Sequence, residues 1–158
     1  MKIRFSLNGK ATEIDSPADR RVIDLLREDL GLTGSKEPCG SGECGGCTIL
    51  VDGESRLSCL MLAAQLQGRR VLTIEGVSSG EEPHPLQQAF VDAGAVQCGF
   101  CTPGMVLASL DLLGRNPRPT RAEIREGISG NICRCTGYQK IVDAVEAASH
   151  RKEEAGTT

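Results

Sequence analysis

The chain has 158 residues, a length that suits one ordinary domain or two small ones. Hydrophobic residues make up 39% of it, but no apolar run reaches the roughly 18 residues that a bilayer-spanning helix needs, so no membrane is expected as a partner. The net charge of −3 argues against nucleic acid as a partner.

The first half of the sequence predicts a small mixed sheet crossed by one helix, over residues 1–76. Apolar residues alternate with polar ones around Asn8-Gly9, a dipeptide typical of a tight hairpin turn. Apolar residues at helical spacing follow over 18–30, and Gly31 is a suitable C-terminal stop. The other predicted elements are a Gly- and Cys-rich loop over 35–47, a second hairpin over 48–57 and a closing strand over 71–74.

The second half of the sequence predicts helices, which makes the fold class α+β. A polar, Pro-containing stretch over 77–85 is typical of a linker. Thr120 and Glu123 have the spacing of a capping box, which predicts a helix start. We expect a helical domain over 86–150, in which four short helices pack as a bundle, and a disordered polar tail over 151–158. The other three helices are expected over 86–93, 103–113 and 138–148.

The chain has eight cysteines, and four of them lie in the first half with C-x4-C-x2-C-x11-C spacing. The N-terminus has no apolar signal segment, so we expect a cytoplasmic protein, in which cysteines are metal ligands more often than disulfides. The spacing is typical of a plant-type ferredoxin cluster, whereas zinc prefers paired C-x2-C knuckles. An iron–sulfur cluster is therefore favoured over zinc or two disulfides. The predicted ligands are Cys39, Cys44, Cys47 and Cys59.

Four glycines interleave with these cysteines and form the predicted cluster loop. Glycine permits positive φ and close backbone approach, so the loop can curl around a small cluster. Amide N–H groups in such a loop can point at the sulfurs and offset the negative charge of the cluster. The four residues are Gly40, Gly42, Gly45 and Gly46.

The second cysteine set has C-x2-C-x31-C-x-C spacing, and each pair falls between two predicted helices. Taken alone, this set leaves zinc and iron–sulfur open. Beside the first set, a second [2Fe–2S] cluster is favoured, because two clusters would form a relay. Arg134 lies between two of the ligands and would either favour the reduced cluster or be a solvated surface side chain. The predicted ligands are Cys98, Cys101, Cys133 and Cys135.

Three motifs around the cysteines resemble the iron–sulfur subunit of the xanthine oxidase family, which comprises molybdenum hydroxylases and dehydrogenases. The motifs are EPCGSGECGGCT over 37–48, QCGFCTPG over 97–104 and GNICRCTGY over 130–138. The likeness extends over about residues 2–148, which is nearly the whole chain.

The resemblance implies a plant-ferredoxin-like β-grasp domain followed by a four-helix bundle. It also implies a large partner subunit with a molybdenum–pterin cofactor, a medium partner subunit with FAD, and assembly as a dimer of heterotrimers. Electrons would run from molybdenum through the cluster of the helical half and then the ferredoxin-like cluster to FAD. Gln97 and Cys135 match family positions that contact the pterin. Substrate contacts lie on the large subunit, so this chain does not select among purines, N-heterocycles, aldehydes, carbon monoxide and aromatic acyl-CoA.

The leading hypothesis is therefore an electron-transfer subunit of a molybdenum enzyme, with no catalytic acid, base or nucleophile of its own. One alternative is a free-standing two-cluster carrier of the ferredoxin type, which gives the helical half no clear purpose. The other is a zinc-stabilised interaction module, which predicts a colourless protein without a redox signal.

Overall fold

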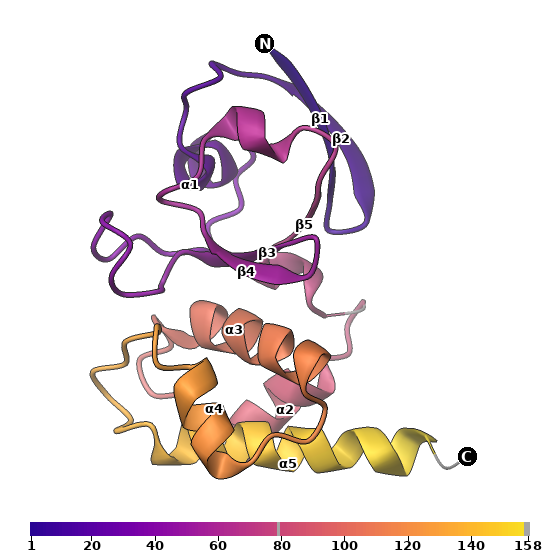
Figure 1. The fold of residues 1–158 in the computed structure, drawn as a ribbon, viewed down its shortest axis with the longest axis vertical. Coiled ribbons are helices and arrows are strands. Elements are labelled where there is room, and N and C mark those ends of the chain that lie inside the picture. The colour runs from indigo at the N-terminus through magenta and orange to yellow at the C-terminus, as the bar shows by residue number, and fades with distance from the viewer. Residues whose placement is uncertain (79, 157–158) are drawn as a thin grey trace.

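The computed structural model describes residues 1–78 and 80–156, with side chains through Arg151. Its elements fall into two groups along the chain, because all five strands precede residue 73 and the long helices follow residue 84. Figure 1 shows the sheet-bearing half above the helical half, with helix α3 lying directly below strands β3 and β4.

The first half contains a five-stranded mixed sheet with the strand order β2-β1-β5-β3-β4. β1 pairs with β5 in parallel, and the other pairs are antiparallel. Both predicted hairpins are present, and the first turns through Asn8 and Gly9, whose φ angles are 51° and 80°. The strand bounds are β1 Lys2–Leu7, β2 Lys10–Asp15, β3 Thr48–Val51, β4 Glu54–Leu57 and β5 Arg70–Leu72.

The predicted helix over 18–30 is shorter than expected and changes type. Helix α1 covers only Val22–Asp24, and it continues as a π-helix, η1, over Leu25–Asp29. The residues before it are extended instead, because Ala63 N–H donates to Arg20 O at 2.7 Å. Tertiary pairing with the segment that begins at Leu62 therefore replaces the first helical turn.

The described chain after the linker forms four α-helices, which the sequence predicted with small errors at their ends. They are α2 Pro85–Asp92, α3 Thr102–Arg115, α4 Arg121–Gly127 and α5 Gln139–Gly156. The predicted disordered tail over 151–158 overlaps the end of α5, so that prediction is corrected as far as Gly156, and 157–158 lie outside the described residues. Two short 3-10 helices were not predicted, η2 at Ala63–Leu66 and η3 at Ile74–Gly76.

Strand β3 joins the two halves because all four of its residues are buried. Ile49 and Val51 pack into the core beneath the sheet, with Ile3 and Leu25. Leu50 points the other way, into the core of the helical half. A strand that is buried on both faces lies between two layers. The helical half therefore packs directly on the sheet, which positions the two cysteine sets relative to each other.

Helix α4 begins with the predicted capping box. The Thr120 hydroxyl accepts from the Glu123 N–H at 3.3 Å, and the Glu123 carboxylate accepts from the Thr120 N–H at 2.6 Å. We expect Thr120→Ala to lower the free energy of unfolding by about 1 kcal/mol, because it leaves a helix N–H without a partner. Thr120→Ser keeps the acceptor and is the control. Urea denaturation of the full chain measures both, and equal stability of the two variants would contradict the cap.

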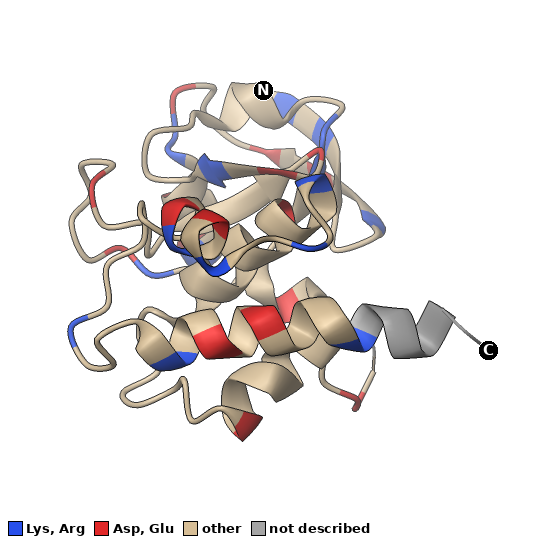
Figure 2. Cartoon of the chain, turned by 60° about the horizontal axis from the view of Figure 1, so that its bottom comes forward, with Lys and Arg blue, Asp and Glu red and all other residues tan. Residues whose placement is uncertain are grey.

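Charged residues of both signs are distributed over the two halves. Figure 2 shows basic and acidic segments interleaved in the sheet-bearing half and along α5. On α4 and α5 they pair, since Arg121 contacts Asp143 at 2.7 Å and also Glu146. Within the described residues, no helix combines the length and the apolar character that crossing a bilayer requires.

Candidate iron–sulfur sites

The first cysteine set lies in the long loop before β3 and in the turn after β4. Cys39 and Cys44 are on the loop, and Cys47 directly precedes β3. Cys59 follows the β3–β4 hairpin, two residues after β4 ends. Cys47 and Cys59 are buried, whereas Cys39 is exposed. Cys47 and Cys59 pack with Ile23 in a small core cluster of their own, so the set extends from the interior to the surface.

Backbone amides of this loop are directed at the thiols. The Ser41 N–H donates to Cys39 Sγ at 3.4 Å, and the Cys44 amide donates to the same sulfur. These hydrogen bonds lower the pKa of Cys39 to about 6, because they favour the thiolate. Burial and the neighbouring Cys47 thiol raise the pKa of Cys59 to about 11. The two pKa values move apart because N–H donors stabilise the Cys39 thiolate, whereas Cys59 is buried and adjoins another thiol.

The four cluster-loop glycines differ in what they contribute. Gly40, Gly42 and Gly45 have φ angles of +64°, +80° and +74°, in the region that disfavours other residues. Gly46 has no positive φ, but a Cβ there would lie 2.7 Å from the Pro38 ring. The Gly42 amide donates to the Cys59 thiol. The loop thus uses glycine both for its backbone conformation and for close packing.

The second cysteine set comes from two inter-helix loops, as the sequence predicted. Cys98 and Cys101 lie between α2 and α3, and Cys133 and Cys135 lie between α4 and α5. Cys98 Sγ is 3.4 Å from Cys135 Sγ, and both residues are exposed. The Cys101 thiol contacts the Cys133 thiol in the same way, and Cys133 is buried. The four residues therefore converge as one outer pair and one inner pair.

The inner pair of the second set is polarised by its surroundings. Burial and the adjoining Cys133 thiol raise the pKa of Cys101 to about 12. Burial acts to raise the pKa of Cys133 as well, but hydrogen bonds from Thr136, the Cys135 amide and the Cys101 thiol together outweigh it and lower that pKa. The Thr136 hydroxyl lies 3.1 Å from Cys133 Sγ, and its amide donates to that sulfur at 3.5 Å. Cys133 is thus the thiol of this pair that gives up its proton more readily.

These donor sets fit two [2Fe–2S] clusters, which take four thiolates each. Two pairs of thiols adjoin in the second set, and Cys47 adjoins Cys59 in the first, which suits irons that each take two thiolates. All eight cysteines are free of disulfides. Among the described residues, no three His, Cys, Asp or Glu side chains converge at the spacing of a single-ion site. N–H groups aimed at Cys39, Cys98 and Cys133 suit the negative charge of a thiolate-bound cluster.

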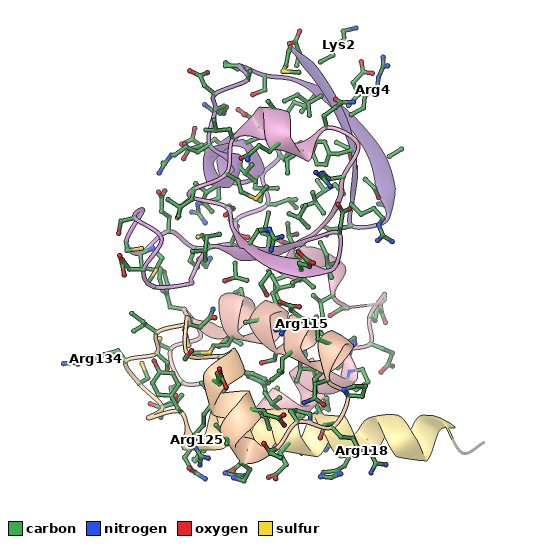
Figure 3. All side chains as sticks on the ribbon, in the orientation of Figure 1. Lys2, Arg4, Arg115, Arg118, Arg125 and Arg134 are labelled. Atoms are coloured by element: carbon green, nitrogen blue, oxygen red, sulfur yellow. The ribbon has the colours of Figure 1, made fainter. Side chains whose placement is uncertain are left out.

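Two residues that the sequence singled out lie at the surface beside the second set. Gln97 is exposed next to Cys98 in the middle of the α2–α3 loop. Arg134 is exposed between Cys133 and Cys135, and Figure 3 shows it projecting outward from the loop. Its exposed position agrees with the solvated-arginine reading.

Sequence reasoning missed three residues whose side chains fix the local structure, one at the start of α2 and two at the cysteine loops. His84 Nδ1 accepts from the Leu86 N–H at 3.1 Å and caps α2. Asn131 is buried at 6% exposure between the two cysteine loops. Tyr138 contacts the backbone of both Asn131 and Cys133. The motif GNICRCTGY contains the last two, but only the structure shows what their side chains contact.

Comparison with known families accounts for both halves of the chain. Residues 5–72 match the family described as a 2Fe-2S iron-sulfur cluster binding domain. Residues 73–146 match a second family, described as a [2Fe-2S] binding domain. Each match contains one complete cysteine set.

Similar proteins span nearly the same length as this chain. The nicotinate dehydrogenase small FeS subunit of Eubacterium barkeri is 51% identical over 149 residues, covering 94% of this chain and 95% of that protein. The xanthine dehydrogenase iron-sulfur-binding subunit of Escherichia coli O157:H7 is 46% identical over 146 residues, covering 90% and 91%.

Solved structures have the same fold. In quinoline 2-oxidoreductase from Pseudomonas putida 86, one chain superposes with a TM-score of 0.94 at 45% identity, covering 100% of this chain and 98% of that one. Aldehyde oxidoreductase from Desulfovibrio gigas gives a TM-score of 0.94 at 37% identity, covering 98% of this chain but 17% of that longer one. With its two [2Fe–2S]-binding regions, this chain belongs to the iron–sulfur subunits of the xanthine oxidase family of molybdenum hydroxylases.

Proposed function

We propose that the chain relays electrons from a molybdenum–pterin site on a large partner subunit to FAD on a medium one. The carrying observation is that one small chain presents two complete sets of four thiols whose loops are in direct contact. Similar proteins named as iron–sulfur subunits of nicotinate and xanthine dehydrogenases support this role. Substrate chemistry then belongs to the large subunit.

Each set of thiols would hold one [2Fe–2S] cluster, which takes up and releases one electron at a time when bound. The protein contributes the thiolates, the N–H donors that stabilise their charge, and burial on the inner side of each set. The first site consists of Cys39, Cys44, Cys47 and Cys59. The second site consists of Cys98, Cys101, Cys133 and Cys135.

The second site would face molybdenum, and the first site would face FAD. Gln97 and Cys135 are both exposed, which suits the contact with the pterin that the family resemblance implies. Cys39 is the exposed thiol of the first site and would mark the side nearer FAD. The cluster loop with Gly40, Gly42, Gly45 and Gly46 would then surround the cluster from which electrons leave the chain.

The chain would comprise two domains within this assembly. Residues 1–76 would be a ferredoxin-like β-grasp domain, 77–85 a linker, and 86–150 a four-helix bundle, beyond which α5 continues to Gly156. Sheet order and the four α-helices that follow residue 84 support this division. The complex would be a cytoplasmic dimer of heterotrimers.

The first experiment measures iron and acid-labile sulfide per chain, with electron paramagnetic resonance after anaerobic dithionite reduction. We expect about four irons, about four sulfides and two distinct reduced signals. Purification from the native host should yield the chain together with molybdenum and flavin. A chain with two clusters that elutes alone would indicate a free-standing carrier. Zinc in place of iron, with no redox signal, would indicate a structural module and overturn the proposal.

A further inference from the structure

The loops that carry the two cysteine sets touch through a backbone hydrogen bond. The Ile132 N–H donates to Cys44 O at 2.9 Å, and Ile132 directly precedes Cys133. Cys44 of the first set is thus connected to Cys133 of the second set through covalent bonds and a single hydrogen bond. The Ile132 side chain is 57% exposed, so its packing does not hold this contact in place. Neighbouring groups must therefore position it.

Asn131 is the residue that holds the two loops together at this point. Its Nδ2 donates to Gly45 O at 3.0 Å and lies 3.4 Å from Thr48 Oγ1. Its own N–H donates to Ile128 O at 3.0 Å, which anchors it in the helical half. Because the side chain is buried, replacing it leaves no water-exposed substitute for the lost donor. Asn131 directly precedes Ile132 and bonds to Gly45, which directly follows Cys44, so it links the two ends of the Cys44–Ile132 contact.

Tyr138 fixes the helical side of the same contact. Its hydroxyl donates to Asn131 O at 3.2 Å and accepts from the Cys133 N–H at 2.8 Å. The two peptide groups that flank Ile132 are therefore bridged by one phenol. Tyr138 thus fixes the backbone that carries the donor, the Ile132 N–H. The Asn131 side-chain amide bonds to the loop that carries the acceptor, Cys44 O.

The two loops also meet at backbone distance. A Cβ on Gly104, two residues into α3, would lie 2.5 Å from Gly45 O. A Cβ on Gly45 would collide with Gly130 O and lie 2.7 Å from Asn131 Nδ2. No side chain can separate the loops here, so the hydrogen-bonded route is the direct connection between them.

We propose that Asn131 is a positioning residue that holds the Cys44 C=O···H–N Ile132 contact as the route of electronic coupling between the two sites. The inference rests on the proposed function, because it requires a [2Fe–2S] cluster in each set. One electron passes from the reduced site of the helical half to the oxidised site of the first half. No bond is formed or broken, and no proton is transferred.

The test uses the full chain with both clusters, fully reduced by dithionite. The two irons of each reduced cluster couple to a net spin equivalent to one unpaired electron, and coupling between the two clusters splits their paramagnetic resonance signals. We expect Asn131→Ala to reduce this splitting, with about four irons and the g values of both signals retained. Asn131→Asp has the same shape but lacks the donor, so it should behave like alanine. Asn116→Ala, at the end of α3, is the matched control and should leave the splitting unchanged.

Unchanged splitting in an Asn131 variant that retains four irons, or an equal loss in Asn116→Ala, overturns the proposal. If neither Asn131 variant assembles both clusters, Tyr138→Phe decides, because it keeps the ring and removes only the bridging hydroxyl. A smaller splitting in Tyr138→Phe supports the proposal, and an unchanged one overturns it. Fewer than about four irons in the unmodified chain would instead refute the proposed function, and the inference with it.

Discussion

Replacing Cys135 with serine is expected to remove one cluster and leave the other intact. Serine keeps the size of cysteine but replaces the soft thiolate that iron–sulfur clusters require. Cys135 forms the outer pair of the second set with Cys98, and that set lies on loops separate from the first. Iron should fall from about four to about two per chain, and one of the two reduced resonance signals should disappear.

The reciprocal variant is Cys59→Ser, which is the matched control. It alters the first set, in which Cys59 adjoins Cys47, and should abolish the other signal. In the assembled complex, Cys135→Ser should also slow electron transfer from the molybdenum side. Loss of both signals in a folded Cys135→Ser chain would contradict the assignment of the ligands to two separate sites.

Replacing Gly45 with alanine is expected to lower the free energy of unfolding by about 2–5 kcal/mol. About 1–2 kcal/mol of this comes from the positive φ of +74°, and about 1–3 kcal/mol from overpacking against the backbone. The added Cβ would collide with Gly130 O and force the first cysteine loop away from the helical half. Urea denaturation of the full, cluster-loaded chain under anaerobic conditions measures the change.

Gly53→Ala is the control that separates the cost of the positive φ from the cost of overpacking. Gly53 has a φ of +88° in the β3–β4 turn, but no atom lies within 4 Å of where its Cβ would be. This variant therefore bears only the conformational cost of about 1–2 kcal/mol. If the two variants were equally destabilised, close packing between the loops would contribute nothing at Gly45.

Local sequence patterns predicted the secondary structure correctly where residues close in the chain determine it. Both hairpins and the capping box at Thr120 are present because turn and cap residues act within four positions. Both pairs of the second cysteine set fall between helices, as their flanking periodicity indicated. The same reasoning failed over 18–30, where hydrogen bonds to the segment near Leu62 override helical spacing. It also ended α5 at Ala148, although the helix runs to Gly156.

The sequence by itself determined the identity of the eight thiols, their division into two sets and the family to which the chain belongs. Cysteine spacing and flanking motifs are properties of the chain order, so they need no coordinates. Only the tertiary structure decided which thiols adjoin, as Cys98 and Cys135 do across 37 positions. It also brought Asn131 against Gly45, 86 positions away. Such contacts depend on the packing of α3 against β3, which no local pattern in the sequence specifies.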